Sequence, residues 1–214
     1  MIDKRLLLAA LLAASAYVLL RGESRDNDTS ESDNAPSIFD EITNTAGDYW
    51  MNVPSNGGNR GAFLSMLRVP EGTSGPDGYR TLVGGALFDS YATHPALAGW
   101  RGLPLSNAMC AGAGLGPGCV STAAGAYQIT KPTYVRVAAK LGITDFSPES
   151  QDAIALELAN EKGALSDIDA GNMDSAIAKV RRVWASLPGA GYGQREESMA
   201  VLRDTFVQAG GVLA

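Results

Sequence analysis

The 214-residue sequence is poor in histidine, cysteine and positive charge, and each shortage excludes a class of function. His94, Cys110 and Cys119 are too few for a multi-histidine metal site, or for a zinc site whose four ligands all come from cysteine and histidine. We therefore expect neither a metal nor a cofactor. A formal net charge of −6 gives no electrostatic support to a nucleic-acid partner.

A Ser-His-Asp triad would have to use His94, because the chain contains no other histidine. His94 precedes Pro95 in a turn-like segment, which is a typical setting for a surface or loop histidine. We interpret His94 in that way and do not expect a triad.

The chain begins with an apolar run that is short for a membrane span. Lys4 and Arg5 precede the uncharged residues 6–20, and Arg21 follows them. As a helix this run is about 22 Å long at about 1.5 Å per residue. A bilayer core is about 30 Å thick and requires about 20 residues, so the run lies between a signal-peptide core and a membrane span.

Two interpretations of residues 1–21 remain open. Ala14-Ser15-Ala16 fits a cleavage site, which would make the segment a signal peptide. Alternatively the run stays uncut as a signal-anchor, and residues 6–20 tether the chain weakly to the inner membrane. We favour the anchor. The positive charges before the run place the N-terminus in the cytoplasm and the rest of the chain in the periplasm, either tethered or released.

Residues 22–58 are interpreted as a largely disordered linker. The stretch "GESRDNDTSESDNA" has no large apolar residue and many acidic ones, so it cannot bury enough surface to offset the entropy lost on ordering. Residues 36–58 are ambiguous, because a short helix there could pack on the domain through Phe39, Ile42 and Trp50. The folded domain is expected to span residues 59–214.

The domain is expected to be α+β and mostly helical, with a small β-hairpin or sheet. Apolar residues recur at helical spacing in segments that carry capping residues or end in glycine or proline. "GYRTLVGG" at residues 78–85 predicts a short hairpin. The predicted helices lie within residues 59–69, 130–142, 147–165, 172–189 and 194–211.

Glu71 stands at the end of an apolar run, after Leu67, Val69 and Pro70. Burial of a carboxyl group in such surroundings raises its pKa, because the charged form loses its hydration. A carboxylic acid that stays protonated near neutral pH can donate a proton to the leaving oxygen of a glycosidic bond. The alternative is a solvated glutamate at a helix end.

Five blocks of sequence carry a resemblance to a known family. They are "RGAFLSMLRVPEGT", "GYRTLVGGALFDSYATHP", "STAAGAYQI", "LGITDFSPESQDAIALELANEKGAL" and "WASLPGAGYGQ". In this order they resemble the lambda-type phage endolysins, which are peptidoglycan lytic transglycosylases of glycoside hydrolase family 104 with a lysozyme-like fold. The resemblance covers about residues 59 to 211, and it implies a lysozyme-like muralytic domain that acts on peptidoglycan glycan strands. We expect the chain to be a monomer.

The resemblance implies roles for particular residues. Glu71 would be the single catalytic acid/base, which protonates the oxygen between N-acetylmuramic acid and N-acetylglucosamine and then deprotonates the muramoyl 6-hydroxyl. That hydroxyl attacks the anomeric carbon of its own sugar, so the product is a 1,6-anhydro sugar and no second carboxylate is needed. Tyr127, Gln128, Tyr192 and Gln194 would contact the glycan, with core and turn packing as the alternative.

The sequence departs from the family in two places. The family carries an aspartate where this chain has Arg80, which puts any charge role of that position in doubt. The loop before "STAAG" is longer and contains Cys110 and Cys119. In an oxidising exported compartment this pair favours a disulfide that closes a flexible insert, with two unlinked thiols as the alternative.

Other functions remain open from the sequence. A hydrolytic lysozyme would need a second carboxylate, for which Asp77 and Asp89 are the candidates. A wall-binding or scaffold protein without activity would not need the intact Glu71. The enzyme could also be a virion component used at entry, although the weak anchor favours a role in lysis.

Overall fold

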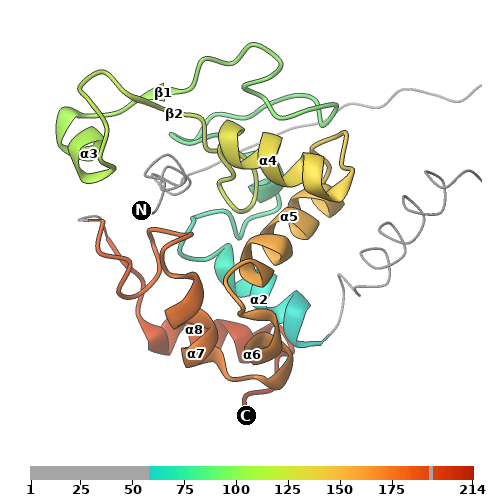
Figure 1. The fold of residues 1–214 in the computed structure, drawn as a ribbon. Coiled ribbons are helices and arrows are strands. Elements are labelled where there is room, and N and C mark those ends of the chain that lie inside the picture. Colours follow the sequence, from blue (N-terminus) through green and yellow to red (C-terminus); the bar gives the residue numbers. More distant parts are fainter. Residues whose placement is uncertain (1–57, 193–194) are drawn as a thin grey trace, which may run out of the picture.

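The computed structural model describes residues 58–192 and 195–214, and helices dominate this part of the chain (Figure 1). The predicted signal-anchor, nearly all of the predicted linker and Gln194 lie outside the described residues. In chain order the elements are α2 (Asn59–Leu67), the 3-10 turn η2 (Gly78–Arg80), β1 (Leu103–Pro104), α3 (Asn107–Gly112), β2 (Val120–Ser121), α4 (Lys131–Leu141), α5 (Pro148–Asn160), α6 (Leu165–Ala170), α7 (Met173–Val180) and α8 (Met199–Gln208).

Across residues 58–192 and 195–214, none of the helices combines the length and the apolar character that crossing a bilayer requires.

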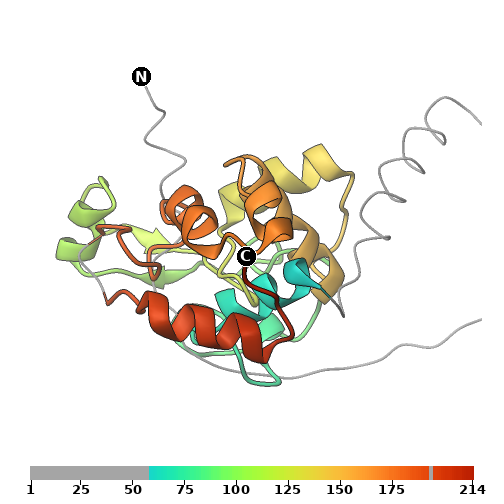
Figure 2. The same ribbon diagram turned by 90° about the horizontal axis from the view of Figure 1, so that it is seen from below.

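Helix α2 occupies the centre of the helical body. It begins at Asn59, where the sequence predicts the domain to start, and it packs against α8, α6 and α5. Phe63, Met66 and Leu67 have no exposed surface, and Ala62 and Leu64 are also buried. A helix that is apolar on most sides has to be covered on several faces. Figure 2 shows α8 lying beside α2 on one of them.

The ends of α4 and α5 follow the capping residues in the sequence. Gly142 ends α4 in the left-handed conformation, which costs glycine nothing because it has no Cβ. Ser147 caps α5 by accepting a hydrogen bond from the backbone of Ser150, and Pro148 occupies the first turn. Both predicted helices are therefore confirmed at these ends.

The helix predicted over residues 172–189 is wrong in length, because α7 ends at Val180. Turns carry the chain from Arg181 to Gly191. Val180 and Trp184 are both buried, as their spacing predicts, but Trp184 reaches the core from a turn. Its indole N–H donates to the carbonyl of Tyr127 at 3.1 Å. This tertiary contact outweighs local helix propensity.

The hairpin predicted at residues 78–85 is reduced to a chain reversal. Residues 78–80 form η2, and a single antiparallel bridge then joins Thr81 to Leu87. On its other edge this segment pairs with the loop before α4, since Leu82 forms a bridge with Ala124 and the Thr81 carbonyl accepts from the backbone of Gly125. The two-stranded sheet lies elsewhere, where β1 and β2 pair antiparallel with Leu103 opposite Ser121.

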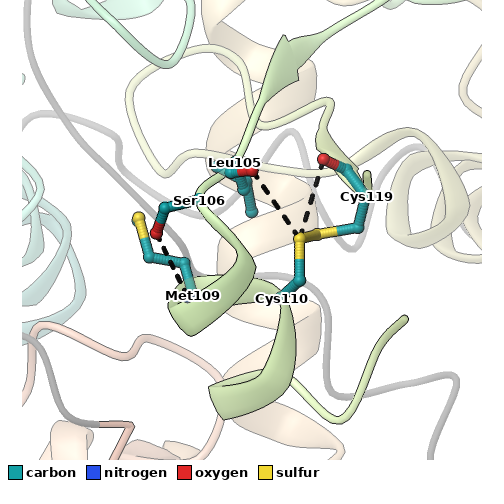
Figure 3. Close-up of a disulfide and its surroundings, with 5 residues drawn as sticks. All are labelled: Leu105, Ser106, Met109, Cys110 and Cys119. Atoms are coloured by element: carbon teal, nitrogen blue, oxygen red, sulfur yellow. Dashed lines mark hydrogen bonds between the residues drawn. A yellow bond between two sulfur atoms is a disulfide. The ribbon is translucent and has the colours of Figure 1, made fainter. Parts of the chain in front are cut away.

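The insert between β1 and β2 is ordered, which corrects the expectation of a flexible loop. A disulfide joins Cys110 to Cys119, so the alternative of unlinked thiols is set aside (Figure 3). Ser106 caps α3 by accepting from the backbone of Met109. Leu105, Cys110 and Ala113 form a small apolar cluster separate from the main core.

The interpretation of His94 as a surface or loop histidine is half wrong, since it lies in a loop but is fully buried. The ring packs against Tyr134 and Phe146. Its Nε2–H donates to the carbonyl of Ile129 at 2.9 Å, and Nδ1 accepts from the backbone of Ala96 at 3.2 Å. Burial lowers the pKa of His94 to about 4. With both nitrogens occupied, His94 cannot act as a general base.

Gln151 holds three loops together from one buried position on α5. Its Oε1 accepts from the backbone of Ala126 at 2.8 Å, and its Nε2 donates to the carbonyls of Tyr79 at 2.9 Å and Phe146 at 2.8 Å. Gly125 is required beside it, because a Cβ there would lie 2.1 Å from Gln151 Oε1. The loops that carry the predicted site residues are thus attached to α5.

Replacing Gln151 with alanine should lower the free energy of unfolding by about 2–4 kcal/mol, because buried backbone groups would lose their partners. Urea unfolding of the full chain measures this change. The matched control is Gln208→Ala on the exposed side of α8, which should change stability by less than about 0.5 kcal/mol. Equal effects of the two substitutions would contradict the role assigned to Gln151.

Candidate active site

Glu71 lies in a tight turn that follows α2 and is only 3% exposed. The backbone of Gly72 donates to the carbonyl of Val69, and that of Thr73 donates to the carbonyl of Arg68. The Thr73 hydroxyl also donates to the carbonyl of Ala126 at 2.6 Å. These bonds attach the turn to both α2 and the loop before α4, so the position of Glu71 is well defined.

Among the described residues, the carboxyl group of Glu71 accepts a hydrogen bond from one side chain. The Ser186 hydroxyl donates to Glu71 Oε1. Burial raises the pKa of Glu71 from 4.5 to about 7, while the hydrogen bond from Ser186 acts in the opposite direction. Near neutral pH the group therefore exchanges readily between the protonated and the charged form, as a general acid and base must.

Two hydrogen bonds fix the position of Ser186, one made by a residue just before it and one made by its own carbonyl. Two residues before it, the Trp184 indole is bonded to the carbonyl of Tyr127. The carbonyl of Ser186 itself accepts from the backbone of Glu197 at 2.8 Å. Sequence reasoning missed Ser186, although it lies in the "WASLPGAGYGQ" block, because a serine without a neighbouring base has no recognisable catalytic pattern.

Tyr127 and Gln128, two predicted glycan contacts, are buried beside the site. The Tyr127 hydroxyl donates to Asp152, and the Gln128 amide donates to the carbonyls of Thr81 at 3.3 Å and Gly125 at 3.0 Å. Gln128 has a positive φ of 46°, the left-handed region that costs a non-glycine residue energy. Its Oε1 has no hydrogen-bond partner. Their predicted contact with sugar stays a prediction.

Asp152 on α5 accepts two hydrogen bonds at one oxygen and was not identified from the sequence. Tyr79 donates to its Oδ1 at 2.7 Å and Tyr127 at 2.6 Å. Burial raises the pKa of Asp152, and the two tyrosines and Arg68 oppose that effect. The Arg68 guanidinium lies 4.8 Å from the centre of the Tyr79 ring. This cluster links the ends of α2, η2 and α5 near the turn that carries Glu71.

Tyr192 and Gln194 are the remaining predicted glycan contacts. Tyr192 is partly buried, and its hydroxyl donates to the carbonyl of Arg182 at 3.2 Å. A Cβ added at Gly112 of α3 would lie 3.4 Å from the Tyr192 carbonyl oxygen, so the disulfide-closed insert approaches this segment. Gln194 lies outside the described residues.

The two acids considered for a hydrolase differ in their surroundings. Asp89 is exposed. Asp77 is partly buried, and its Oδ1 has no hydrogen-bond partner. Burial raises the pKa of Asp77, and nearby Arg80 opposes the shift. Arg80 is buried and donates from Nε and Nη2 to the carbonyl of Phe88.

Within residues 58–192 and 195–214, no group of three or more histidine, cysteine, aspartate or glutamate residues could hold a metal ion.

Comparisons with known proteins identify the family. The sequence model of the Endolysin family matches residues 61–213. The endolysin of Escherichia phage lambda is 42% identical over 160 residues, which is 72% of this chain and 92% of that protein. The endolysin of Escherichia phage P2 is 42% identical over 166 residues, which is 73% of this chain and 95% of that protein.

Solved structures agree with the sequence relatives. Bacteriophage lambda lysozyme in complex with a chitohexasaccharide superimposes with a TM-score of 0.62 and 41% identity, covering 73% of this chain and 96% of that one. A second structure of lysozyme from bacteriophage lambda gives a TM-score of 0.59 and 40% identity over the same shares. The resemblance carried by the five sequence blocks is confirmed. This chain belongs to the Endolysin family, with a lysozyme-like domain that begins near Asn59.

Proposed function

We propose that this phage endolysin cleaves the glycan strands of bacterial peptidoglycan as a lytic transglycosylase. The observation that carries the proposal is the buried Glu71 carboxyl, whose pKa of about 7 makes it both an acid and a base at neutral pH. The lambda lysozyme that shares this fold was solved with a bound chitohexasaccharide, which supports a glycan as the substrate.

The proposed reaction uses Glu71 twice. In its protonated form the carboxyl group donates a proton to the glycosidic oxygen, so that N-acetylglucosamine leaves from the anomeric carbon of N-acetylmuramic acid. The resulting carboxylate then accepts the proton of the muramoyl 6-hydroxyl as that oxygen bonds to the anomeric carbon. No water is consumed. Because the attacking hydroxyl belongs to the same sugar, its high effective concentration replaces a separately bound nucleophile.

The family resemblance supports a single carboxylate over the hydrolytic alternative. A lysozyme that hydrolyses the bond places a second carboxylate at about 5–5.5 Å or about 6.5–9.5 Å from the acid. The influences on the Glu71 pKa are burial and the Ser186 hydroxyl. The family resemblance assigns the reaction to a single acid/base, which supports the transglycosylase. Membership of the Endolysin family also supports a role in lysis over one in virion entry.

Replacing Glu71 with glutamine should lower the rate at which the enzyme clears outer-membrane-permeabilised cells by a factor of about 10³ or more, since the proton donor and acceptor is lost. Muropeptides released by the wild type should carry 1,6-anhydro ends when analysed by mass spectrometry. Reducing ends with added water would instead establish the hydrolase.

Asp89→Asn provides the matched control, because it also neutralises one acid but at an exposed position. It should clear cells at the rate of the wild type. Equal clearing by the wild type and the Glu71→Gln variant would overturn the assignment of Glu71.

The raised pKa of Glu71 also has a stability consequence. Between pH 4.5 and about pH 7 the unfolded chain has lost this proton while the folded chain retains it, so unfolding releases a proton. The contribution of Glu71 to folding therefore becomes less favourable as the pH rises through that window. A glutamine in the same place does not titrate, and its Oε1 can still accept from Ser186.

We expect Glu71→Gln to be more stable than the wild type at pH 8, by up to about 3 kcal/mol, and equal to it near pH 4. Comparison of the two proteins by urea unfolding at both pH values isolates Glu71, because the other titrating groups are shared. If the variant were less stable than the wild type at pH 8, burial would not disfavour the charged form of Glu71 as we infer.

The start of the chain leads to a proposal about localisation. Residues 6–20 would tether the enzyme to the inner membrane as an uncut signal-anchor, with the catalytic domain in the periplasm, until release allows it to reach the wall. Fractionation of expressing cells should find the protein in the membrane before depolarisation and in the soluble periplasm afterwards. Retention in the membrane fraction throughout, or an N-terminus cut after Ala16, would contradict this proposal.

A further inference from the structure

The turn that follows Ser186 is closed by the side chain of Glu196. Glu196 Oε2 accepts from the backbone N–H of Gly189, and Oε1 accepts from that of Gly191, both at 2.7 Å. These bonds, together with a further one from the backbone of Ala190 and the charge of Arg181, lower the pKa of Glu196. The carboxylate is therefore charged at neutral pH, although the side chain lies at the surface.

The backbone of this turn is shaped to receive a carboxylate. Gly189 and Gly191 both have a φ of 74°, in the left-handed region that favours glycine, while Ala190 between them is completely buried. Backbone N–H groups that alternate in this way converge into a concave anion-binding arrangement. The Glu196 carboxylate supplies the acceptor for the N–H groups of Gly189 and Gly191, while that of Ala190 also donates to the carbonyl of Leu187 at 3.1 Å. We therefore expect the shape of the turn to depend on Glu196.

The same segment of chain also holds Ser186. Glu197, the residue after Glu196, donates its backbone N–H to the carbonyl of Ser186 at 2.8 Å. Ser186 is thus fixed through its own carbonyl and through the turn that follows it. Its hydroxyl donates to Oε1 of Glu71. A continuous set of contacts therefore leads from the Glu196 carboxylate, through residues 186–191, to the proposed catalytic acid.

We propose that Glu196 is a positioning residue for Glu71, acting through the 186–191 turn and the Ser186 hydroxyl. This inference rests on the proposed function, because it assigns to Glu196 an effect on the acid that performs the reaction. Glu196 does not touch the reacting atoms in this account. It determines where the Ser186 hydroxyl points, and so where the Glu71 carboxyl is held.

The direction in which the Glu71 pKa changes distinguishes a positioning role of Glu196 from a simple effect of its charge. The hydrogen bond from Ser186 lowers the pKa of Glu71, so loss of that bond raises it. Removal of the Glu196 charge by itself would act the other way, since a nearby negative charge favours the protonated carboxyl. Arg181, whose guanidinium lies against Gly189, acts on the Glu196 pKa. Arg195 and Glu197 adjoin Glu196 in the chain and form an ion pair with each other.

The test compares Glu196→Gln with Glu196→Ala in the full chain. Glutamine keeps the shape of the side chain but can accept only one of the two N–H donors, because its NH2 group would face the other. Both substitutions should lower kcat on purified peptidoglycan, Glu196→Ala by roughly tenfold or more, since a displacement of about 1 Å can cost about 10²-fold. KM should change little. In both variants the alkaline limb of the pH–activity profile should move to higher pH.

A double-mutant comparison tests whether the effect passes through Ser186. Ser186→Ala alone should shift the alkaline limb upward, and adding Glu196→Gln to it should produce no further shift, because coupled residues are not additive. Asp204→Asn is the charge-matched control, since this acid lies on the exposed side of α8. It should leave both the rate and the pH profile unchanged. Thermal unfolding of every variant identifies any that fails to fold.

Several results would overturn the inference. One is a folded Glu196→Gln variant that loses activity while the alkaline limb of its pH–activity profile stays in place. Another is a shift of that limb to lower pH. A further upward shift when Glu196→Gln is added to Ser186→Ala would show that Glu196 does not act through the serine. An active Glu71→Gln variant would refute the proposed function itself, whereas a failure confined to the Glu196 variants leaves the role of Glu71 intact.

Discussion

The Glu71 carboxyl is held out of water with the Ser186 hydroxyl as its partner, and much of the surrounding structure serves to maintain that arrangement. A buried carboxylate is costly unless it is paired or hydrogen-bonded, and within residues 58–192 and 195–214 the Ser186 hydroxyl is the influence that opposes burial at Glu71. The group therefore remains protonated to an unusually high pH. The buried Glu71 carboxyl lowers the folding stability at neutral and higher pH, a cost that is common at residues retained for function.

Three segments that are distant in the sequence have to meet for this arrangement to exist. Glu71 follows the central helix α2, Ser186 lies in the turns after α7, and Ala126 anchors the Glu71 turn through Thr73. The loops between these segments are kept in place mainly by polar groups of α5. Gln151 and Asp152 are consecutive there, and together they contact the carbonyl of Tyr79 and the hydroxyls of Tyr79 and Tyr127.

The helices were accessible from local pattern, and the family resemblance singled out Glu71 as the candidate acid. Capping at Ser147 and Gly142 depends on neighbouring residues, so the sequence predicts these boundaries well. The hairpin at residues 78–85 and the length of α7 were not accessible in this way. After α7, the bond from the Trp184 indole to the carbonyl of Tyr127 joins a segment far along the chain and overrides local preference. Residues 81 and 82 pair on one edge with residues 124 and 125, a contact that no local pattern specifies.

The sequence by itself determined the family and the helical character of the domain, because short motifs and periodic apolar residues encode them, and it pointed to Glu71 as the candidate acid. Tertiary structure alone decided the burial of His94, the partnership of Ser186 with Glu71 and the closure of the 186–191 turn by Glu196. The physical reason is that desolvation and hydrogen bonding depend on which distant groups surround a side chain. No local pattern of residues specifies those surroundings.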